Sequence, residues 1–235
     1  MFDIEQHLDL LPDNVKIINI SYKLIKYLPD LSRFKNLKYL YCDTNELTSL
    51  PVLPEKLKIL ICYNNNLTSL PDLPENLERL ECCYNQLTSL PILNKNLKIL
   101  DCKHNLLTSL PVLPKNLKRL YCHYNKLSLL PVLPENLIEL CCYSNDIKSL
   151  PVLSEKLKVL IYFGNPIYNI IHNNDLNIMN KQIKIWNNFR YLYYCLKYRK
   201  RFLRMMEPVI KKRYHPSYLY NLKEEDDLDE KLNEW

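Results

Sequence analysis

The chain has 235 residues, of which 47% are hydrophobic, and its 32 basic and 26 acidic side chains give a formal net charge of +6. No apolar run approaches the roughly 18 residues of a membrane span, and the first residues lack the charged and apolar regions of a signal peptide. We therefore expect an intracellular, cytoplasmic protein without a membrane segment.

Residues 1–14 are too short to form a domain, and we expect them to cover the open end of a hydrophobic core. A divergent 22-residue unit follows from Val15, with Lys23 at the place where later units carry asparagine. Such a departure is typical of the first, capping unit of a repeat array.

A 20-residue pattern then repeats without a gap. Its copies start at Leu37, Leu57, Leu77, Leu97, Leu117 and Leu137, with a degenerate copy at Leu157. The template is L-x-x-L-x-C-x-x-N-x-L-x-x-L-P-x-L-P-x-x, and its asparagine falls at Asn45, Asn65, Asn85, Asn105, Asn125, Asn145 and Asn165. This period is the signature of leucine-rich repeats. Because one unit cannot bury its own leucines, about eight units must stack into a solenoid over residues 15–166.

Strand alternation predicts that positions 4 and 6 of each unit point inward and positions 3, 5 and 7 outward. The LPVLPE segment after each strand has proline at two of six positions, which excludes an interior helix. We therefore predict an α/β repeat protein, mostly β: a horseshoe-shaped solenoid with one parallel concave sheet, an extended proline-rich convex wall and a C-terminal helical cap.

Asparagine is expected to have two structural roles in the repeats. Its side chain lies where it can bond backbone groups that no strand partner reaches. Because the chain has one glycine, we also expect asparagine to adopt the left-handed backbone of the tight turns.

The unit LPxLPxxLxxLxxxxNxLxxLP resembles the short leucine-rich repeats of bacterial effector proteins, over roughly Val15 to Pro166. The cysteine at position 6 and the tail rich in tyrosine and asparagine resemble repeat proteins encoded by giant DNA viruses of amoebae. Some of the bacterial effectors append a cysteine-dependent ubiquitin ligase domain. Here residues 167–235 hold only Cys195, followed by Leu196 rather than an acid, so the resemblance implies at most an accessory subunit of a ubiquitin-ligase-like assembly.

Six of the nine cysteines form a column at position 6, namely Cys42, Cys62, Cys82, Cys102, Cys122 and Cys142. We expect these thiols to be reduced and buried, because a core thiol behaves as a small hydrophobe. Cys83, Cys141 and Cys195 are expected to be more accessible. His104 and His123 point away from the neighbouring column cysteines, so neither pair predicts a metal site. No motif indicates catalysis or a cofactor.

From Asp175 the apolar spacing changes to that of a helix, which Pro208 ends no later than about Glu207. We expect residues 167–213 to form a basic helical cap and residues 214–235 an acidic, disordered tail. The basic side chains considered are Arg190, Lys197, Arg199, Lys200, Arg201 and Arg204. Three interpretations stay open: a solvated face of the cap, a patch for nucleic acid or an anionic surface, and a calmodulin-type target resembling a degenerate IQ motif.

The outward positions of the repeats vary and are rich in aromatic and basic residues, which supply most binding energy at protein interfaces. The predicted partner-binding residues are Tyr39, Tyr41, Tyr63, Arg79, Tyr84, Lys103, Arg119, Tyr121, His123, Tyr124, Tyr143 and Phe163. The alternative is that tyrosine is frequent here simply because it favours strands. We expect a monomeric, noncatalytic scaffold for a partner protein, with nucleic-acid binding through the basic helix as the alternative.

Overall fold

The structure, a computed structural model, describes residues 2–171 and 175–197, with the side chains of the last helix described as far as Arg190. The chain divides into two units, Met1–Ile185 and Trp186–Trp235. All the repeats belong to the first unit, which also contains the candidate functional site.

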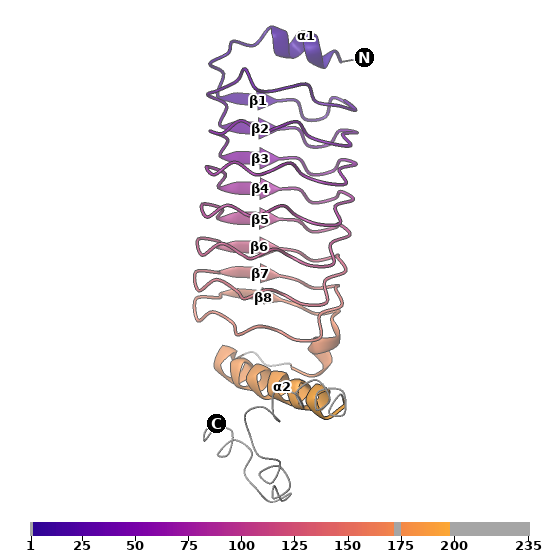
Figure 1. The fold of residues 1–235 in the computed structure, drawn as a ribbon, viewed down its shortest axis with the longest axis vertical. Helices are drawn as coiled ribbons and strands as arrows, with labels where there is room; N and C mark the ends of the chain where they lie inside the picture. Colours follow the sequence, from indigo (N-terminus) through magenta and orange to yellow (C-terminus); the bar gives the residue numbers. More distant parts are fainter. Residues whose placement is uncertain (1, 172–174, 198–235) are drawn as a thin grey trace, which may run out of the picture. The chain divides into compact units, whose positions relative to one another are not determined.

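One parallel sheet organises the first unit, and its described strands follow one another in chain order (Figure 1). They are β1 (Ile17–Asn19), β2 (Tyr39–Tyr41), β3 (Ile59–Ile61), β4 (Arg79–Glu81), β5 (Ile99–Asp101), β6 (Arg119–Tyr121), β7 (Glu139–Cys141) and β8 (Val159–Ile161). Leu40 pairs with Leu60, and Leu60 with Leu80, so residues 20 apart are neighbours in space. The period of the sequence thereby becomes a set of straight columns.

The inward columns form the core. Leu37, Leu40, Cys42 and Leu47 of the first regular unit are all fully buried, and the equivalent residues of the next units behave alike. This arrangement confirms the predicted inward direction of positions 4 and 6. The same column geometry continues through the degenerate unit, where Leu157 is still buried.

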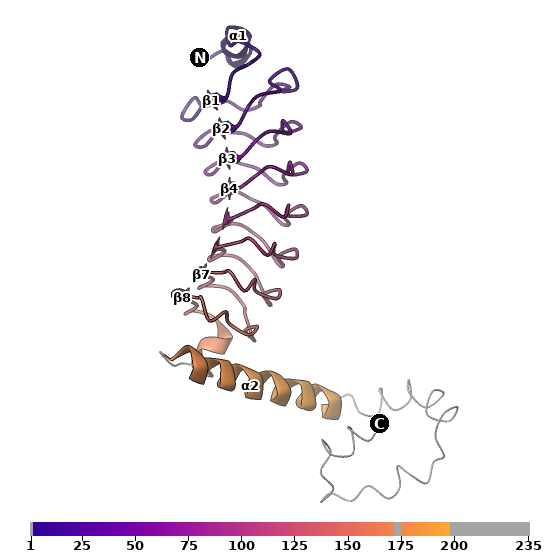
Figure 2. The ribbon, with the colours of Figure 1, turned by 90° about the vertical axis from the view of Figure 1, so that its left-hand side faces the viewer.

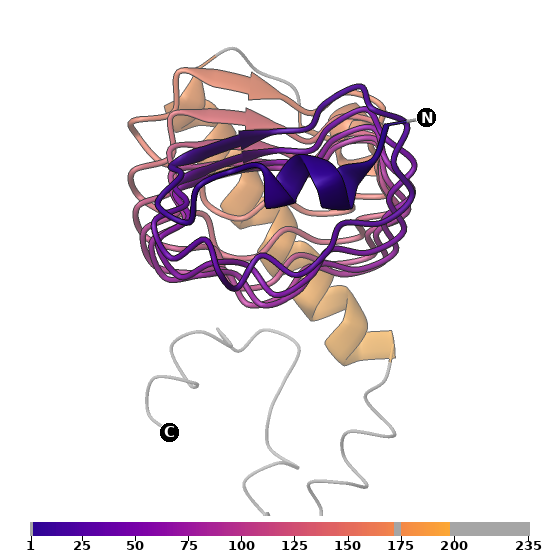
Figure 3. The same cartoon turned by 90° about the horizontal axis from the view of Figure 1, so that it is seen from above.

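The segment after each strand forms the opposite wall and contains no helix within residues 46–158. In the first regular unit Leu50 and Leu53 are buried, whereas Val52 between them is exposed. The wall is thus extended, as its prolines require. Figure 2 shows the strands along the concave side and the extended wall along the convex side, and Figure 3 shows the coils superposed along the array. The predicted leucine-rich-repeat solenoid is confirmed.

The asparagine column joins consecutive units. The Asn65 side chain donates from Nδ2 to the carbonyls of Cys42 (3.0 Å) and Cys62 (3.2 Å), and its Oδ1 accepts from the Leu47 amide (3.0 Å). Asn105 repeats the pattern with Cys82, Cys102 and Leu87. Each asparagine therefore satisfies buried backbone groups of its own unit and of the preceding unit, as predicted.

The left-handed backbone lies one residue before this column, so the prediction that asparagine adopts it holds at Asn64 (φ 54°) and not for the column asparagines themselves. Positive φ occurs at Thr44 (53°), Tyr84 (52°) and His104 (50°), and the single glycine, Gly164, has φ 65°. The conformation aims the carbonyl of this residue at the preceding unit, where it accepts a bond from the asparagine amide, for example Asn85 N to His104 O at 3.2 Å. That interunit bond offsets the strain of a non-glycine residue in this region.

A second set of asparagines follows the exposed corner of the wall. The side chains of Asn76, Asn96, Asn116 and Asn136 each donate to a carbonyl of the preceding unit, at 2.8–3.2 Å. Unlike the inner column, these bonds are exposed to solvent. Their sequence signal is asparagine at position 20 of four consecutive units.

Each end of the array has a helix. At the start, α1 (Ile4–Asp9) buries Ile4 and Leu8, and the Asp3 side chain caps it by accepting from the Gln6 amide at 3.0 Å. The sequence pattern did not predict this helix. That residues 1–14 act as a cap stays a prediction, in agreement with the burial of these two apolar side chains.

After the last repeat come a 3₁₀ turn, η1 (Pro166–Asn169), and the predicted C-terminal helix, α2 (Leu176–Lys197). Met179 and Ile183 of α2 are buried, and Asn180 makes two hydrogen bonds with the Leu153 backbone, at 2.9 and 3.1 Å. The expected end of the helix near Glu207 lies outside the described residues. Neither α1 nor α2, over the residues described, is long and apolar enough to cross a membrane.

Candidate functional site: the concave face of the sheet

The concave face is formed by the outward side chains at positions 3, 5, 7 and 8 of each unit. Positions 3 and 5 are the first and last residues of each strand, and strand pairing keeps them in register, for example Glu81 beside Asp101 and Asp101 beside Tyr121. Neighbouring strands lie about 4.8 Å apart, so equal positions are close enough for direct side-chain contact. The face is thus a set of parallel side-chain columns.

An aromatic cluster extends over positions 7 and 8 from the end of β4 to the end of β8. Its members are Tyr84, His104, His123, Tyr124, Tyr143 and Phe163. The His104 ring stacks between the rings of Tyr84 and Tyr124, with both centroid distances 4.2 Å. His104 is absent from the predicted binding residues, although aromatic residues at position 8 of three consecutive units indicate such a stack.

A second stack of the aromatic cluster contains Tyr143, whose ring centroid lies 4.2 Å from that of His123 and 4.6 Å from that of Phe163. Tyr124 contacts Tyr143 edge-on at 5.2 Å and so joins the two stacks. Tyr84, Tyr124 and Phe163 remain 46–48% exposed. These rings are already ordered by stacking, so a partner that covers them loses little side-chain entropy on binding.

His123 differs from the other predicted binding residues because only 9% of it is exposed, and its buried Nδ1 has no hydrogen-bond partner among the described residues. Burial, reinforced by the positive charge of Lys103, lowers the pKa of His123 to about 4. The imidazole is therefore neutral near pH 7. The structure gives His123 a supporting position behind Tyr143 rather than an open surface position.

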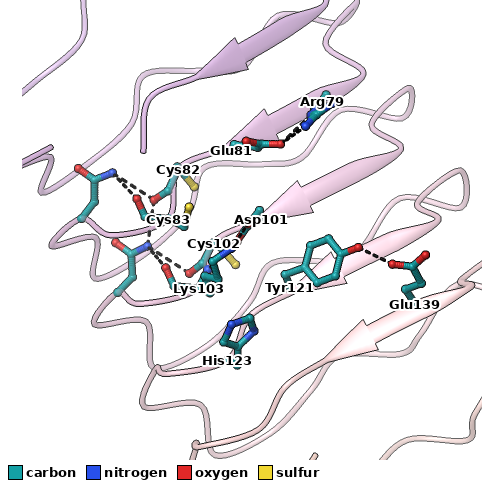
Figure 4. Close-up of polar contacts among 12 residues, drawn as sticks. Arg79, Glu81, Cys82, Cys83, Asp101, Cys102, Lys103, Tyr121, His123 and Glu139 are labelled. Atoms are coloured by element: carbon teal, nitrogen blue, oxygen red, sulfur yellow. Dashed lines mark hydrogen bonds and ion pairs between the residues drawn. The ribbon is translucent and has the colours of Figure 1, made fainter. Parts of the chain in front are cut away.

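The basic side chains at the centre of the face are paired with acids (Figure 4). Arg79 donates from Nε to Glu81 at 2.7 Å, and Lys103 donates from Nζ to Asp101 at 2.7 Å. Glu81 and Asp101 are register neighbours, so these cations relieve a repulsion between two adjacent carboxylates. Arg79 and Lys103 are consequently engaged within the chain and are not bare positive charges.

The pairing continues on β6 and β7. Arg119 lies 3.1 Å from the Glu139 carboxylate. The Tyr121 hydroxyl donates to the same carboxylate, as Figure 4 shows. Burial raises the pKa of Tyr121 to about 12, and the bond to Glu139 adds to the shift. Tyr121 therefore presents its ring rather than a free hydroxyl.

The remaining predicted tyrosines lie around hollows in the N-terminal half of the concave face. Tyr41 and Tyr63 line a cavity of about 630 Å³, Tyr63 and Tyr84 line another of about 460 Å³, and Tyr39 lines a third of about 340 Å³. The concave face thus has two kinds of surface: hollows lined by tyrosines near β1–β5, and stacked rings from the end of β4 to the end of β8.

The thiols of the cysteine column are free and fully buried, and burial raises their pKa values, as for Cys42 and Cys142. Cys83 and Cys141, which we expected to be more accessible than the column thiols, are 5% and 8% exposed against 0% for the column, so the order agrees but both thiols are nevertheless buried. Burial raises the pKa of Cys83 to about 12. In the described part of the chain no three His, Cys, Asp or Glu side chains converge as metal ligands would.

The basic residues of the tail are placed only in part. Arg190 and Lys197 belong to α2, and Arg190 is partly exposed. Arg199, Lys200, Arg201 and Arg204 lie outside the described residues. Their role in binding stays a prediction.

No protein-family model matches the sequence, and no curated protein matches it either. Among solved structures, the chain is similar to YopM of Yersinia enterocolitica, with 32% identity and a TM-score of 0.55 over 66% of this chain and 39% of that chain. It is also similar to YopM, a leucine-rich effector protein of Yersinia pestis, with 33% identity and a TM-score of 0.56 over 64% of this chain and 49% of that chain. The chain therefore spans half or less of these two proteins.

A third similar structure is the leucine-rich-repeat domain of a Shigella effector, with 31% identity and a TM-score of 0.61 over 69% of this chain and 74% of that chain. The expected similarity to bacterial effector repeats is thus confirmed. Its basis in this chain is the 20-residue period, the in-register parallel sheet and the inner asparagine column. The chain belongs to the leucine-rich-repeat proteins, and its repeats are of the kind found in these bacterial effectors.

Proposed function

We propose that the chain is a noncatalytic scaffold that binds a partner protein on its concave face. The observation that carries this proposal is the aromatic cluster, in which Tyr84, Tyr124 and Phe163 are about half exposed although they stack on their neighbours. Ordered, exposed aromatic rings bury a large area at a small entropy cost, and such residues dominate the binding energy of protein interfaces.

The charges of the face favour a protein partner over a polyanion. Arg79, Lys103 and Arg119 each pair with an acid of the same face. Nucleic-acid binding depends on basic side chains that neutralise phosphates, whereas here the nearest charges around the rings already neutralise one another. A mixed, nearly neutral surface around an aromatic centre is typical of a protein interface.

The cellular setting is proposed from the resemblance to repeat proteins of giant DNA viruses. We infer an intracellular partner, which would be a host factor in the cytoplasm if the chain is viral. The buried, free thiols of the cysteine column agree with a reducing compartment, since disulfides are rare there. We propose that the chain acts as a monomer.

The test compares the proteins that are captured by three forms of the full chain. The first is unmodified, the second carries Tyr84→Ala, Tyr124→Ala and Phe163→Ala, and the third carries Val112→Ala and Val132→Ala. Val112 and Val132 are exposed on the convex wall, so the third form is a matched control for loss of surface apolar area. Proteins retained by the first and third forms but not by the second are identified, purified and titrated by calorimetry.

We expect each aromatic substitution, made singly, to weaken binding by about 1–3 kcal/mol, and the wall substitutions to leave affinity unchanged. A circular dichroism melt of each form shows that the fold is intact. If the triple variant binds as well as the unmodified chain, the interface lies elsewhere. If the ligand is instead RNA and its affinity falls steeply with salt, the basic helix is the binding element and the proposal is wrong.

A further inference from the structure

One carboxylate of the concave face stands apart from the others. The acidic residues at the outward positions of the repeats are Asp43, Glu81, Asp101 and Glu139. Glu81, Asp101 and Glu139 each have a basic partner in the chain. Asp43 forms no ion pair with any side chain that the structure describes, although it is only 5% exposed.

The contacts of Asp43 are neutral. Its Oδ1 accepts from the Ser21 hydroxyl at 2.6 Å, and its Oδ2 lies 3.5 Å from the Thr44 hydroxyl. The Tyr63 hydroxyl is also hydrogen-bonded to the Asp43 carboxylate, and the pKa of Tyr63 is raised, first by its hydrogen bond with Tyr22 and further by burial, by the charge of Asp43 and by this bond. A buried carboxylate held only by hydroxyls is costly, because a full charge lacks a compensating opposite charge.

Asp43 borders a hollow of the concave face, a cavity of about 630 Å³ that Tyr22, Tyr41 and Tyr63 also line. This cavity is within the size range of ligand sites and much larger than one side chain requires. Lys23 lines the same cavity, but its Nζ lies over the Phe2 ring, 5.3 Å from the centroid. We call this site the Asp43 hollow.

We propose that the Asp43 hollow receives an arginine side chain of the partner protein. This inference rests on the proposed function and deepens it, since it assigns a basic residue to the partner. A guanidinium can form a charge-assisted hydrogen bond with the carboxylate while its flat face stacks on a tyrosine ring. Lysine offers a point charge without that planar face, so it is the weaker ligand. The aromatic cluster and the Asp43 hollow would then contact two different parts of one partner.

The proposal is tested without the partner, by ¹H–¹⁵N correlation spectra of the full chain during titration with N-acetyl-arginine amide. The neutral isostere N-acetyl-citrulline amide and N-acetyl-lysine amide are titrated in parallel. We expect saturable shifts of the Tyr41, Asp43 and Tyr63 amides with the arginine probe, at a dissociation constant on the order of millimolar. Citrulline should bind at least about tenfold more weakly, since a hydrogen bond to a charged group is lost, and lysine should lie between the two.

Variants separate this site from general charge attraction. Asp43→Asn keeps an oxygen for the Ser21 hydroxyl but removes the charge, and we expect it to weaken arginine binding about tenfold. The control Glu139→Gln removes a concave carboxylate that already has a cation, and it should leave the arginine affinity unchanged. Tyr41→Leu provides a second variant, which should weaken binding several-fold through loss of a ring face.

Three results would overturn the proposal: no saturable shift with arginine, equal binding of citrulline, or equal effects of Asp43→Asn and Glu139→Gln. The comparison of arginine with citrulline uses the unmodified chain, so it decides the matter even if a variant fails to fold. Failure here leaves the proposed function standing, because that function is tested by the aromatic triple variant. If instead the test of the proposed function fails, binding of the arginine probe can still be measured independently.

Discussion

The inner columns and the concave face are made by the same strands in the same register, yet they differ in what each column contains. Inside, leucine, cysteine and asparagine repeat almost unchanged, and the residues are fully or nearly fully buried. On the concave face, one column passes from Ser21 and Asp43 through Tyr63 and Cys83 to Lys103 and the rings beyond. Because the units stack in register, the repeated inward residues form a uniform core. The varied outward residues form a surface that differs from unit to unit.

This contrast has an energetic consequence. A residue of an inner column contacts equivalent residues in the units before and after it, so one substitution disturbs two interfaces. A residue of the concave face contacts its neighbours along one side and solvent or a partner along the other. We therefore expect stability effects to be large for the inner columns and small on the face, except where a face residue is itself covered.

The largest effect on stability is expected for a buried residue of α2, the helix that follows the last repeat. Ile183 of α2 is fully buried, whereas Ile185, two residues later on the same helix, is 69% exposed. Ile183→Ala should lower the free energy of unfolding by about 2–5 kcal/mol through lost burial and a residual cavity. Ile185→Ala, the matched control, should change it by less than about 0.5 kcal/mol. Urea denaturation measures both, and equal effects would show that α2 does not close the core.

A smaller effect separates the two asparagine sets. Asn105→Ala should cost about 1–3 kcal/mol, because buried backbone groups of two units lose their hydrogen bonds. Asn116→Ala breaks one bond on the exposed corner, where water replaces the lost donor, so we expect a cost below about 0.5 kcal/mol. The same denaturation experiment ranks them. A cost for Asn116→Ala equal to that for Asn105→Ala would contradict the distinction between inner column and surface.

The smallest effect concerns the covered histidine of the face. The pKa of His123 is about 4 in the folded state and about 6.5 in an unfolded chain. Between these values the unfolded state binds more protons, so stability is full above about pH 6.5 and falls as the pH decreases towards about 4. The difference between the two pKa values sets an upper limit of about 3 kcal/mol, and we expect about 1–2 kcal/mol because solvent at the concave face screens the charge.

His123→Phe keeps a ring against Tyr143 but removes the titration, and so it isolates this contribution. We expect the variant to lose less stability than the unmodified chain between about pH 7 and about pH 4.5, after the shared loss from carboxylates is subtracted. Urea denaturation at the two pH values provides the measurement. An identical loss in both proteins would mean that His123 is protonated while folded and therefore lies open on the face.

The regular part of the fold could be predicted because one short-range pattern recurs in register. Two facts, a period of 20 and strand alternation, were sufficient to place Leu40 and Cys42 inside and Tyr41 outside. Proline spacing was sufficient to predict an extended wall. The left-handed residue was predicted correctly only at Asn64, because the pattern shows at which position asparagine recurs but not which peptide must turn. Thr44, Tyr84 and His104 carry that turn with no common side chain.

The candidate site was predicted less completely, because its properties depend on contacts between units. Alternation indicated that Tyr84, Tyr124 and Phe163 point outward, but it could not show that His104 joins them in a stack. Arg79 and Lys103 were predicted as partner-binding residues, but the sequence pattern did not predict that each pairs with an acid two residues away. Residues i and i+2 of an extended segment point to the same face. Alternation therefore indicates that these oppositely charged side chains are neighbours, which the residue types alone do not show.

The sequence by itself determined the repeat, the inward columns and the aromatic content of the concave face, because each follows from a period of two along a strand or 20 along the chain. Only the tertiary structure decided which outward side chains are covered and which are open. Cys83, Cys141 and His123 are outward by alternation but buried in fact, and Asp43, beside a hollow, has hydroxyl partners but no cation among the described side chains. The physical reason is that the exposure of an outward residue depends on the size of the side chains beside it in the neighbouring units. Those side chains are about 4.8 Å away in space but 20 residues away in sequence.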